Sequence, residues 1–424
     1  MTNKLAIAAA VASLLCSGIA ARPSSAEGDT TIHVAYSYPS TWQPIQTALA
    51  AAFEKEHPDI HIEFLAPYTD YEDATQKVLR CAATGDVPDL VWIGLNRQRV
   101  FVDKGIAVDL TPFTAKEADW EKRGYTGAMM DLGRIDGKVY GIATGISTAV
   151  IYYNGDLVRQ AGGDPNNFPK TWDGVIALGG KIKALGNNSG GMFIDWDGTG
   201  NWLFQNLVFA AGGTMTTSDE KNVAFNDPAG LWAVNTLSQM MTEGGMPNIS
   251  GTAAIEAFLA GKLGMYIDSV ADVPDYEANV GKRFDLRTAP FPLASAKGRL
   301  AAGGAAGMML AKDPAAQAAA WEYLKFAGSS EGSAIVAQTS GYMPPNILAA
   351  TEHLTDFYKA HQNQYVSIQQ LPYVTGWYAF PGPNGLKIFD VIKGHLGDVV
   401  SGTAKPADAL AAMATDVQVL LPKN

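Results

Sequence analysis

Residues 31–94 read TIHVAYSYPSTWQPIQTALAAAFEKEHPDIHIEFLAPYTDYEDATQKVLRCAATGDVPDLVWIG. In this stretch the β-rich segments TIHVAY, IHIEFL and DLVWIG are separated by two patterns with apolar residues at helical spacing. The first helical pattern, at 43–57, ends at Pro58, and the second, at 71–83, ends at Gly85. The order strand, helix, strand, helix, strand predicts a parallel α/β lobe.

Later segments repeat this alternation of strands and helices. VYGIA and TAVIYYN predict strands, 172–185 a helix, GKLGMYIDS a buried strand and 315–327 an alanine-rich helix. A chain of about 400 residues is too long for one hydrophobic core, so we expect two domains. Because no extended linker separates them, the domains should be joined by several short crossings.

The N-terminus has the layout of a cleaved secretory signal. Lys4 precedes the apolar run at 5–21, and small residues follow before Glu27. We therefore assign residues 1–26 to a signal peptide. The apolar run is short for a bilayer span, so we expect the mature protein to be free in the periplasm.

The two cysteines bear on anchoring and on stability. Cys81 alone follows the signal segment, so we expect no intrachain disulfide and a fold held by core burial. It falls in a helical pattern, where we expect it to be a buried small apolar residue. A lipid anchor at Cys16 is the minor interpretation, because bulky Leu15 stands where a lipoprotein cleavage box has a small residue.

The charge of the chain limits its partners. The formal net charge is −11, and it becomes −13 once Lys4 and Arg22 are removed with the signal segment. A surface this acidic, without basic runs, argues against nucleic acid or an anionic membrane as a partner. A small-molecule ligand and a protein partner fit better.

The segment at 146–178, ISTAVIYYNGDLVRQAGGDPNNFPKTWDGVIAL, resembles the extracellular solute-binding proteins of ABC importers, in the maltose-binding and glycerol-3-phosphate-binding group. Four further segments fall in the order of that family: GDVPDLVWIG at 85–94, FLAGKLGMYIDS at 258–269, AAGGAAGMMLAKDP at 301–314 and SGYMPP at 340–345. The resemblance therefore covers essentially the whole mature chain.

This resemblance implies the α/β fold of periplasmic binding proteins, with two α/β lobes joined by a multi-crossing hinge and the ligand cleft between them. It implies an N-terminal lobe at 27–143 and 289–328 and a C-terminal lobe at 144–288 and 329–424. The crossings are expected near Thr144, near Ala289 and near Ser329. Ligands of open α/β sheets bind beyond the carboxyl ends of strands, which agrees with such a cleft.

A sugar site needs aromatic planes for stacking and short polar groups for hydrogen bonds. The glycine-containing loop FIDWDGTGNWLF, at 193–204, supplies Trp196, Asp197 and Trp202 as candidates. One of the two tryptophans could instead pack in the core. The loop is also acidic enough for calcium, but it lacks the ligand spacing of an EF-hand, so we expect no metal there.

Two further loops carry aromatic candidates. The loop YVTGWYAFPGPNG places Trp377 and Tyr378 before prolines and glycines. Their rings either face a ligand or pack inside the lobe and hold the last helices against it. The first strand ends in a polar and aromatic cluster that includes Tyr38. Ser40 or Thr41 in this cluster is expected to cap the next helix.

Other candidates follow from the resemblance to the glycerol-phosphate binders. It places ligand contacts at five positions in this sequence: Tyr71, Ser147, Ser269, Gly304 and Tyr342. This sequence differs from that group at two places that bear on the ligand. Leu95, with Asn96 beside it, stands where that group has a glutamate, and the loop at 373–384 lacks the phosphate-binding arginine. Without a bidentate arginine, a neutral ligand is favoured.

These observations predict a substrate-binding component of an ABC importer, monomeric, that captures a sugar or sugar-like polyol and delivers it to the permease subunits. An anionic glycerol-phosphate or sulfonated-sugar ligand remains an alternative. We expect no enzymatic activity and no cofactor, because the six histidines are scattered and no nucleophile-elbow motif is present. The alternative from another class is a secreted glycoside hydrolase, in which Asp195 and Asp197 would be the two acids.

Overall fold

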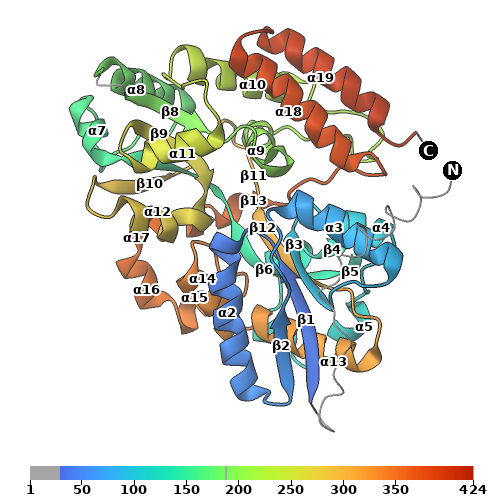
Figure 1. Ribbon diagram of the computed structural model, residues 1–424. Coiled ribbons are helices and arrows are strands. Elements are labelled where there is room, and N and C mark those ends of the chain that lie inside the picture. Colours follow the sequence, from blue (N-terminus) through green and yellow to red (C-terminus); the bar gives the residue numbers. More distant parts are fainter. Residues whose placement is uncertain (1–28, 187–188, 424) are drawn as a thin grey trace, which may run out of the picture. The chain divides into compact units, whose positions relative to one another are not determined.

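The computed structural model describes residues 29–186 and 189–423, and the chain divides into two compact units (Figure 1). Unit 1 contains Met1–Thr144, Ala305–Val336 and Pro345–Ala349, and unit 2 contains Gly145–Gly304, Ala337–Pro344 and Ala350–Asn424. The signal peptide predicted at 1–26 lies outside the described residues.

The chain passes between the units more than once, after Thr144, Gly304, Val336, Pro344 and Ala349. The sequence interpretation placed 289–304 with the N-terminal lobe, whereas the structure groups these residues with unit 2. The reason is strand pairing. Strand β10 (Leu286–Pro290) runs antiparallel to β7 (Ala149–Asn154), with Ala289 opposite Ile151, and this pairing fixes the following residues in unit 2.

Unit 1 is built on a five-stranded sheet in the order β2-β1-β3-β12-β6. These strands are β1 (Thr30–Tyr36), β2 (Ile60–Phe64), β3 (Leu90–Gly94), β6 (Gly141–Ser147) and β12 (Gly303–Met309). Strand β1 is parallel to β2 and to β3, as predicted. The predicted parallel arrangement therefore holds for these three strands but not for the whole sheet, because β12 runs antiparallel to β3. This strand comes from much later in the chain, so local sequence order did not reveal its direction.

The helices predicted for unit 1 are confirmed as α2 (Pro39–Glu56), α3 (Tyr71–Thr84) and α13 (Pro314–Gly328). Shorter elements complete the unit: α4 (Gln98–Asp103), α5 (Thr111–Thr114), η1 (Glu121–Arg123), α6 (Ala128–Asp131), the strand pair β4 (Arg134–Ile135) and β5 (Lys138–Val139), and α14 (Ser330–Thr339), which continues into unit 2. The core joins helices to sheet, since the Tyr323 ring lies 5.0 Å from Phe53 and 5.6 Å from Trp92.

The ends of these helices follow from local sequence. Helix α3 begins at Asp70, whose carboxylate accepts a hydrogen bond from the Asp73 amide at 2.8 Å, and it ends at Gly85 with φ 89°. Cys81 lies half-buried in α3, so the prediction that it is a buried residue is wrong. Its position on the flank of the helix, away from the centre of the apolar stripe, accounts for the difference.

The prediction that Ser40 or Thr41 caps α2 is wrong. Pro39 is the first residue of α2, so both side chains lie inside its first turn. The N-cap is Tyr38, with φ 51° and no side-chain cap, and its carbonyl oxygen accepts hydrogen bonds from the amides of Thr41 and Trp42. A proline at the first helical position favours this earlier start, because its fixed φ suits the helix and its missing amide donor is not needed there.

Unit 2 is built on a four-stranded sheet in the order β10-β7-β9-β8, in which β8 (Gly190–Ile194) and β9 (Leu263–Ser269) are parallel and β7 is antiparallel to both β9 and β10. The strands predicted from TAVIYYN and GKLGMYIDS are therefore confirmed as β7 and β9. A second, two-stranded sheet joins β11 (Leu300–Ala301) to β13 (Val374–Thr375) in parallel.

The helix predicted at 172–185 is confirmed as α8 (Trp172–Ala184). The remaining helices of unit 2 are α7 (Gly155–Gln160), η2 (Thr199–Asn201), α9 (Trp202–Ala210), α10 (Pro228–Thr242), α11 (Gly251–Leu259), η3 (Val270–Asp272), α12 (Val273–Val280), α15 (Ala349–Glu352), α16 (Thr355–Ala360), α17 (Gln362–Ile368), η4 (Leu371–Tyr373), α18 (Gly385–Ser401) and α19 (Pro406–Leu420). Helices α18 and α19 lie side by side and pack with α10 (Figure 1).

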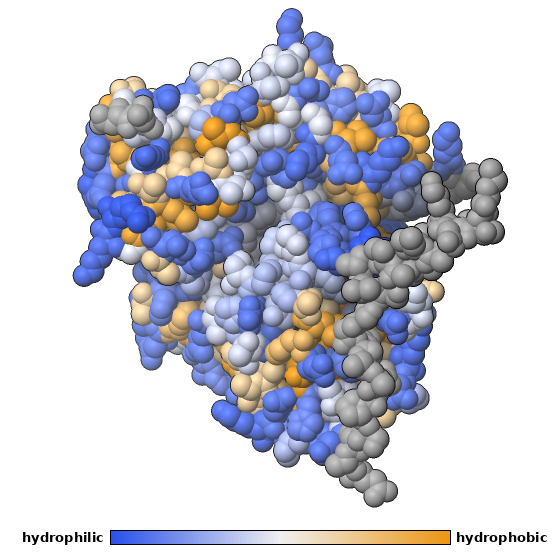
Figure 2. Space-filling model, in the orientation of Figure 1, coloured by the Kyte–Doolittle hydropathy of each residue, from blue (hydrophilic) through white to orange (hydrophobic). Residues whose placement is uncertain are grey.

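Hydrophilic and hydrophobic residues are interspersed on the face drawn in Figure 2. Among the residues that the structure describes, six large apolar side chains are exposed, and three of them, Tyr365, Leu371 and Tyr373, lie close together in the sequence. Within 29–186 and 189–423, no helix combines the length and the apolar character needed to cross a bilayer.

Candidate functional site

In unit 1 the candidate residues gather where neighbouring parallel strands end. The register places Tyr36 at the end of β1 opposite Trp92 of β3. Ser37 and Tyr38 therefore leave the sheet at the same edge as the segment 94–97, which follows β3. This carboxyl edge is the place where open α/β sheets bind ligands.

Two tyrosines form an aromatic wall at this edge. The rings of Tyr38 and Tyr71 meet edge to face, with 4.9 Å between centroids and 77° between planes. The Tyr71 ring also lies against the backbone of Gly94, where a Cβ would come within 2.6 Å of Cδ2. A glycine is therefore required at 94, and the close approach fixes the Tyr71 ring in place.

Two buried polar side chains at the same edge have no hydrogen-bond partner among the described residues. They are the Asn96 amide, through both its nitrogen and its oxygen, and the Ser37 hydroxyl. Asn96 is 1% exposed and Ser37 is fully buried. A buried polar group without a partner costs roughly 1–3 kcal/mol, so native proteins usually provide one. A ligand with hydroxyl groups could provide it here.

The sequence analysis singled out Asn96 and passed over its neighbour Arg97. Arg97 is 1% exposed and forms an ion pair with Glu72 at the start of α3. Burial lowers the pKa of the Arg97 guanidinium, while the nearby Glu72 carboxylate opposes that shift. A charged residue three positions after a fully buried strand is the signal that could have marked Arg97, because this position lies at the carboxyl edge.

In unit 2 the strand register brings three candidates to one edge of the sheet. Ala149 lies opposite Ser269, so Ser147 lies close to the end of β9. Ile194 pairs with Ile267 in the parallel strands β8 and β9, so Trp196 follows the neighbouring strand end. The Ser269 hydroxyl accepts a hydrogen bond from the Ala271 amide at 3.1 Å and caps η3, which gives this side chain a structural role.

Trp202 and Trp377 pack together near Ser147. Their rings lie 6.0 Å apart, and the Trp202 Nε1 donates a hydrogen bond to the Ala301 carbonyl oxygen at 2.9 Å. A Cβ at Gly303 would lie 2.4 Å from the Ser147 Oγ and 2.8 Å from the Trp202 ring. Trp202 therefore serves partly as a packed core residue, whereas the Trp377 Nε1 is buried without a partner among the described residues.

Trp196 is half-buried, and its ring lies against helix α18. A Cβ at Gly397 of that helix would come within 3.5 Å of the Trp196 ring. The Trp196 Nε1 and the Asn201 side-chain oxygen are both buried, and neither finds a partner in the part of the chain that the structure describes. Asp197 lies 3.9 Å from the Lys393 ammonium.

Tyr378 is held within unit 2 at both ends. Its hydroxyl lies 2.6 Å from the Thr216 hydroxyl and donates to the Glu220 carboxylate at 3.3 Å. Its amide donates to the Gln205 side-chain oxygen at 3.0 Å. These contacts tie the loop at 373–384 to the unit, so the hydroxyl is engaged in structure.

Gly304 and Tyr342 lie beside the start of unit 2. Gly304 has φ 106°, and a Cβ there would come within 2.0 Å of the Gly145 carbonyl oxygen, so the position requires glycine because two backbone segments meet. Tyr342 is 6% exposed. It precedes Met343, whose amide donates to the Ile146 carbonyl oxygen at 2.7 Å.

Two acids at the strand ends of unit 2 were not predicted to contact the solute: Asp195 was considered only as an acid of the hydrolase alternative, and Asp268 was not considered. Asp195 follows β8, and Asp268 lies near the end of the adjacent β9. Burial, together with the charge of Asp272, raises the pKa of Asp268 to about 8. Burial and then the charges of Asp268 and Asp197 raise the pKa of Asp195 well above its usual value. These carboxyls are therefore held toward the protonated form, which can donate hydrogen bonds.

The geometry offers no metal site in the described ranges, where no three side chains of His, Cys, Asp or Glu are arranged to hold an ion. The strand ends instead combine aromatic rings, amides, hydroxyls and protonated carboxyls. Such groups bind a small polar solute through stacking and hydrogen bonds.

Comparisons with known proteins agree with this arrangement. The sequence profile of the bacterial extracellular solute-binding protein family matches residues 37–334. The sn-glycerol-3-phosphate-binding periplasmic protein UgpB of Pectobacterium atrosepticum is 25% identical over 86% of this chain and 85% of its own length.

Two solved structures have the same fold. UgpB from Mycobacterium tuberculosis in complex with glycerophosphocholine superposes with a TM-score of 0.80, at 20% identity over 91% of this chain and 97% of that one. Maltose-bound MalE3 of T. maritima superposes with a TM-score of 0.76, at 18% identity over 92% of this chain and 100% of that one. The predicted fold of two α/β lobes is confirmed.

Proposed function

Because the chain belongs to the bacterial extracellular solute-binding protein family, we propose that it captures a sugar or sugar-like polyol between its lobes and delivers it to the permease subunits of an ABC importer. It is a binding protein rather than an enzyme, which sets the glycoside hydrolase alternative aside. In this proposal the protein acts as a monomer in the periplasm and needs no cofactor.

The observation that carries this proposal is the set of buried polar atoms without partners at the strand ends. Unit 1 has them at Ser37 and Asn96, and unit 2 has them at Trp196, Asn201 and Trp377. Donors and acceptors occur together in this set, which contains two indole rings, two side-chain amides and one hydroxyl. A solute with several hydroxyl groups and one apolar face matches that chemistry.

The proposed mechanism is closure of the two lobes around the solute. Binding shifts an equilibrium between open and closed forms only when the solute interacts better with the closed form. Each unit must therefore contribute contacts. We assign Tyr38, Tyr71 and Asn96 to one side and Ser147, Trp196 and Tyr342 to the other, with the closed form docking on the permease.

The second candidate ligand is an anion such as a glycerol phosphate. Two observations favour it: Arg97 is buried at the strand ends of unit 1, and UgpB relatives are named for sn-glycerol-3-phosphate. Against it, the Arg97 charge is already balanced by Glu72. A guanidinium held by a carboxylate neutralises an added phosphate poorly, so we rank the neutral solute first.

A thermal-shift screen tests both candidates. The neutral panel contains arabinose, maltose and sorbitol, and the anionic panel contains sn-glycerol-3-phosphate, glycerophosphocholine and a sulfonated hexose. A solute at a hundred times its Kd stabilises the folded form by about 2.7 kcal/mol, which raises Tm by a few degrees. Stabilisation by the anionic panel alone would overturn the neutral assignment, and calorimetry of each hit would give its affinity.

A further inference from the structure

Unit 2 contains a cavity of about 650 Å³ that the proposed solute site does not use. Its lining comes from residues 165–170, which follow α7, and from Gln369, Gln370 and Tyr373 around η4. The end of β10 and the residues after it form the floor. All of these segments belong to unit 2, and a volume of this size is typical of small-molecule sites.

Aromatic side chains give the cavity a rigid floor and one exposed plane. The Phe168 ring stacks on Tyr153 at 4.3 Å, and Phe291 meets Trp172 edge to face at 4.8 Å. The Trp172 Nε1 in turn donates to the Pro292 carbonyl oxygen at 2.9 Å. Tyr373, which also lines the cavity, remains 41% exposed. A planar or puckered ring could bind between these surfaces.

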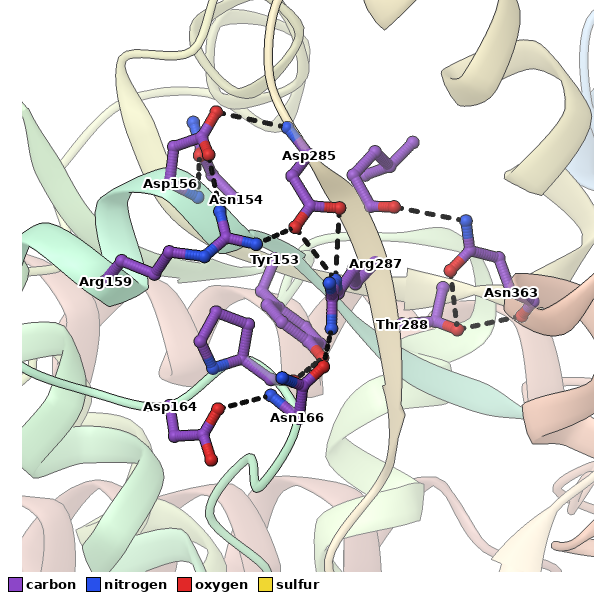
Figure 3. A network of polar contacts seen from close by, with 12 residues as sticks. Tyr153, Asn154, Asp156, Arg159, Asp164, Asn166, Asp285, Arg287, Thr288 and Asn363 are labelled. Carbon is purple, nitrogen blue, oxygen red and sulfur yellow. Dashed lines mark hydrogen bonds and ion pairs between the residues drawn. The ribbon is translucent and has the colours of Figure 1, made fainter.

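The charges beside the cavity are already paired, as Figure 3 shows. The Asp285 carboxylate binds both Arg159 and Arg287, and the Arg287 Nη1 donates to the Asn166 side-chain oxygen at 2.7 Å. Burial alone would raise the pKa of Asp285, but the hydrogen bonds from these two arginines hold it below its usual value, so the network stays ionised. Asp156 also pairs with Arg159, so the two acids and two arginines of this network cancel and leave little net charge there.

Lys170 is the cation that lines the cavity itself. It is exposed, and its ammonium makes no ion pair with any residue in 29–186 or 189–423. The side-chain amides of Asn167 and Gln369 also line the cavity and make no hydrogen bond within those same ranges. No acidic residue is among the described lining residues. The cavity therefore presents one unbalanced positive charge in a protein whose formal net charge is −11.

We propose that this cavity is a second binding site, which takes a small ring-bearing carboxylate, either an aromatic acid or a sugar acid. The carboxylate pairs with the Lys170 ammonium, the ring lies between Phe291 and Tyr373, and the amides of Asn167 and Gln369 bind polar substituents. The site is distinct from the solute capture proposed above, because none of the residues assigned to that capture lines this cavity.

The test uses the protein labelled with 5-fluorotryptophan and followed by fluorine NMR. Trp172 contacts the cavity floor through Phe291 and Pro292, so its signal, assigned by its loss in Trp172→Phe, reports occupancy. Sodium benzoate and sodium glucuronate are titrated separately, with glucose as the neutral control. We expect one or both carboxylates to shift the Trp172 signal saturably and glucose to leave it unchanged.

Lys170→Gln should weaken carboxylate binding about tenfold, since a charge-assisted contact is lost. The matched control is Lys262→Gln, an exposed lysine after α11 that does not line the cavity. Tyr373→Ala should also weaken binding without unfolding the protein, because the ring is exposed.

A response to benzoate alone identifies aromatic acids, and a response to glucuronate alone identifies sugar acids. The proposal is overturned by equal affinity in Lys170→Gln and wild type, by the absence of any Trp172 shift, or by shifts confined to Trp196 and Trp377. The last result would place the probe at the solute site. None of these outcomes bears on the solute screen, so the two proposals fail independently.

Discussion

At the strand ends of unit 1, Arg97 is buried beside the opposite charge of Glu72, whereas at those of unit 2 the half-buried Asp195 and Asp268 lie beside other acids. An ion pair keeps its charges over a wide pH range. Buried acids without a close cation instead keep their protons as the pH rises. The two halves of the proposed site therefore present a permanently charged surface and a pH-sensitive one.

The largest effect should come from Asp268→Asn, which tests the pH-sensitive half. Below about pH 4 Asp268 is protonated in both the folded and the unfolded chain, so the variant and wild type should be equally stable. Between pH 4 and 8 the unfolded chain ionises while the folded one keeps its proton, because the pKa is raised to about 8. Wild type thus loses stability as the pH rises, and at pH 9 the variant should be more stable by on the order of 3 kcal/mol.

Urea unfolding at several pH values measures this difference. Asp219→Asn is the control of opposite sign, because a hydrogen bond from Thr217 lowers the pKa of Asp219. The stability that the ionised Asp219 carboxylate contributes is lost as the pH falls. The control variant should therefore be the less stable protein at neutral pH and match wild type in acid. A pH-independent difference for Asp268→Asn would contradict the comparison.

Next in size is Glu72→Gln, which breaks the ion pair of unit 1. The Arg97 guanidinium would remain buried without its carboxylate, and we expect a loss of about 2 kcal/mol in the free energy of unfolding. The loss should be nearly the same at pH 6 and pH 9, whereas the effect of Asp268→Asn in unit 2 should change with pH. Glu56→Gln, an exposed glutamate at the end of α2, is the matched control and should change little.

Trp196→Ala tests which tryptophan of unit 2 contacts the solute. Removal of its stacking plane should cost about 1 kcal/mol of binding, a roughly fivefold increase in Kd by calorimetry. Trp232→Ala, at a half-buried tryptophan of α10, should leave the affinity unchanged. An unaltered Kd in Trp196→Ala would remove this residue from the proposed site.

The smallest effect concerns stability within the tryptophan pair. Trp202→Phe removes the hydrogen bond to the Ala301 carbonyl oxygen and should lower the free energy of unfolding by about 1 kcal/mol. Trp377→Phe removes a buried donor that has no partner among the described residues, so it should cost less. Thermal or urea unfolding of both variants compares them directly, and equal losses would refute this distinction.

Much of the fold was predictable because its signals are local. The spacing of apolar residues identified α2, α3, α8 and α13, and the alternating or continuous apolar runs identified the main strands. The direction of β12 was not predictable in this way, since pairing between distant segments leaves no local signal. The grouping of residues 289–304 depends on pairing of the same kind.

The residues of the candidate site were likewise only partly predictable from local sequence. Residue types and their position in loops after strands were visible in the sequence, which is why Tyr38 and Trp196 were singled out, and the family resemblance added Asn96. Arg97 and the acids Asp195 and Asp268 were missed as site residues, because their importance comes from burial and from neighbours that are distant in sequence.

The sequence by itself determined the alternation of strands and helices, the excess of acidic residues and the aromatic loops, because each depends only on composition or on residues that are close together in the sequence. Only the tertiary structure decided which polar atoms are buried without partners, which charges are balanced and which tryptophan has its hydrogen bond satisfied. Those properties depend on strand register and on packing between distant segments, and they fix the electrostatics of the strand ends where we place the solute.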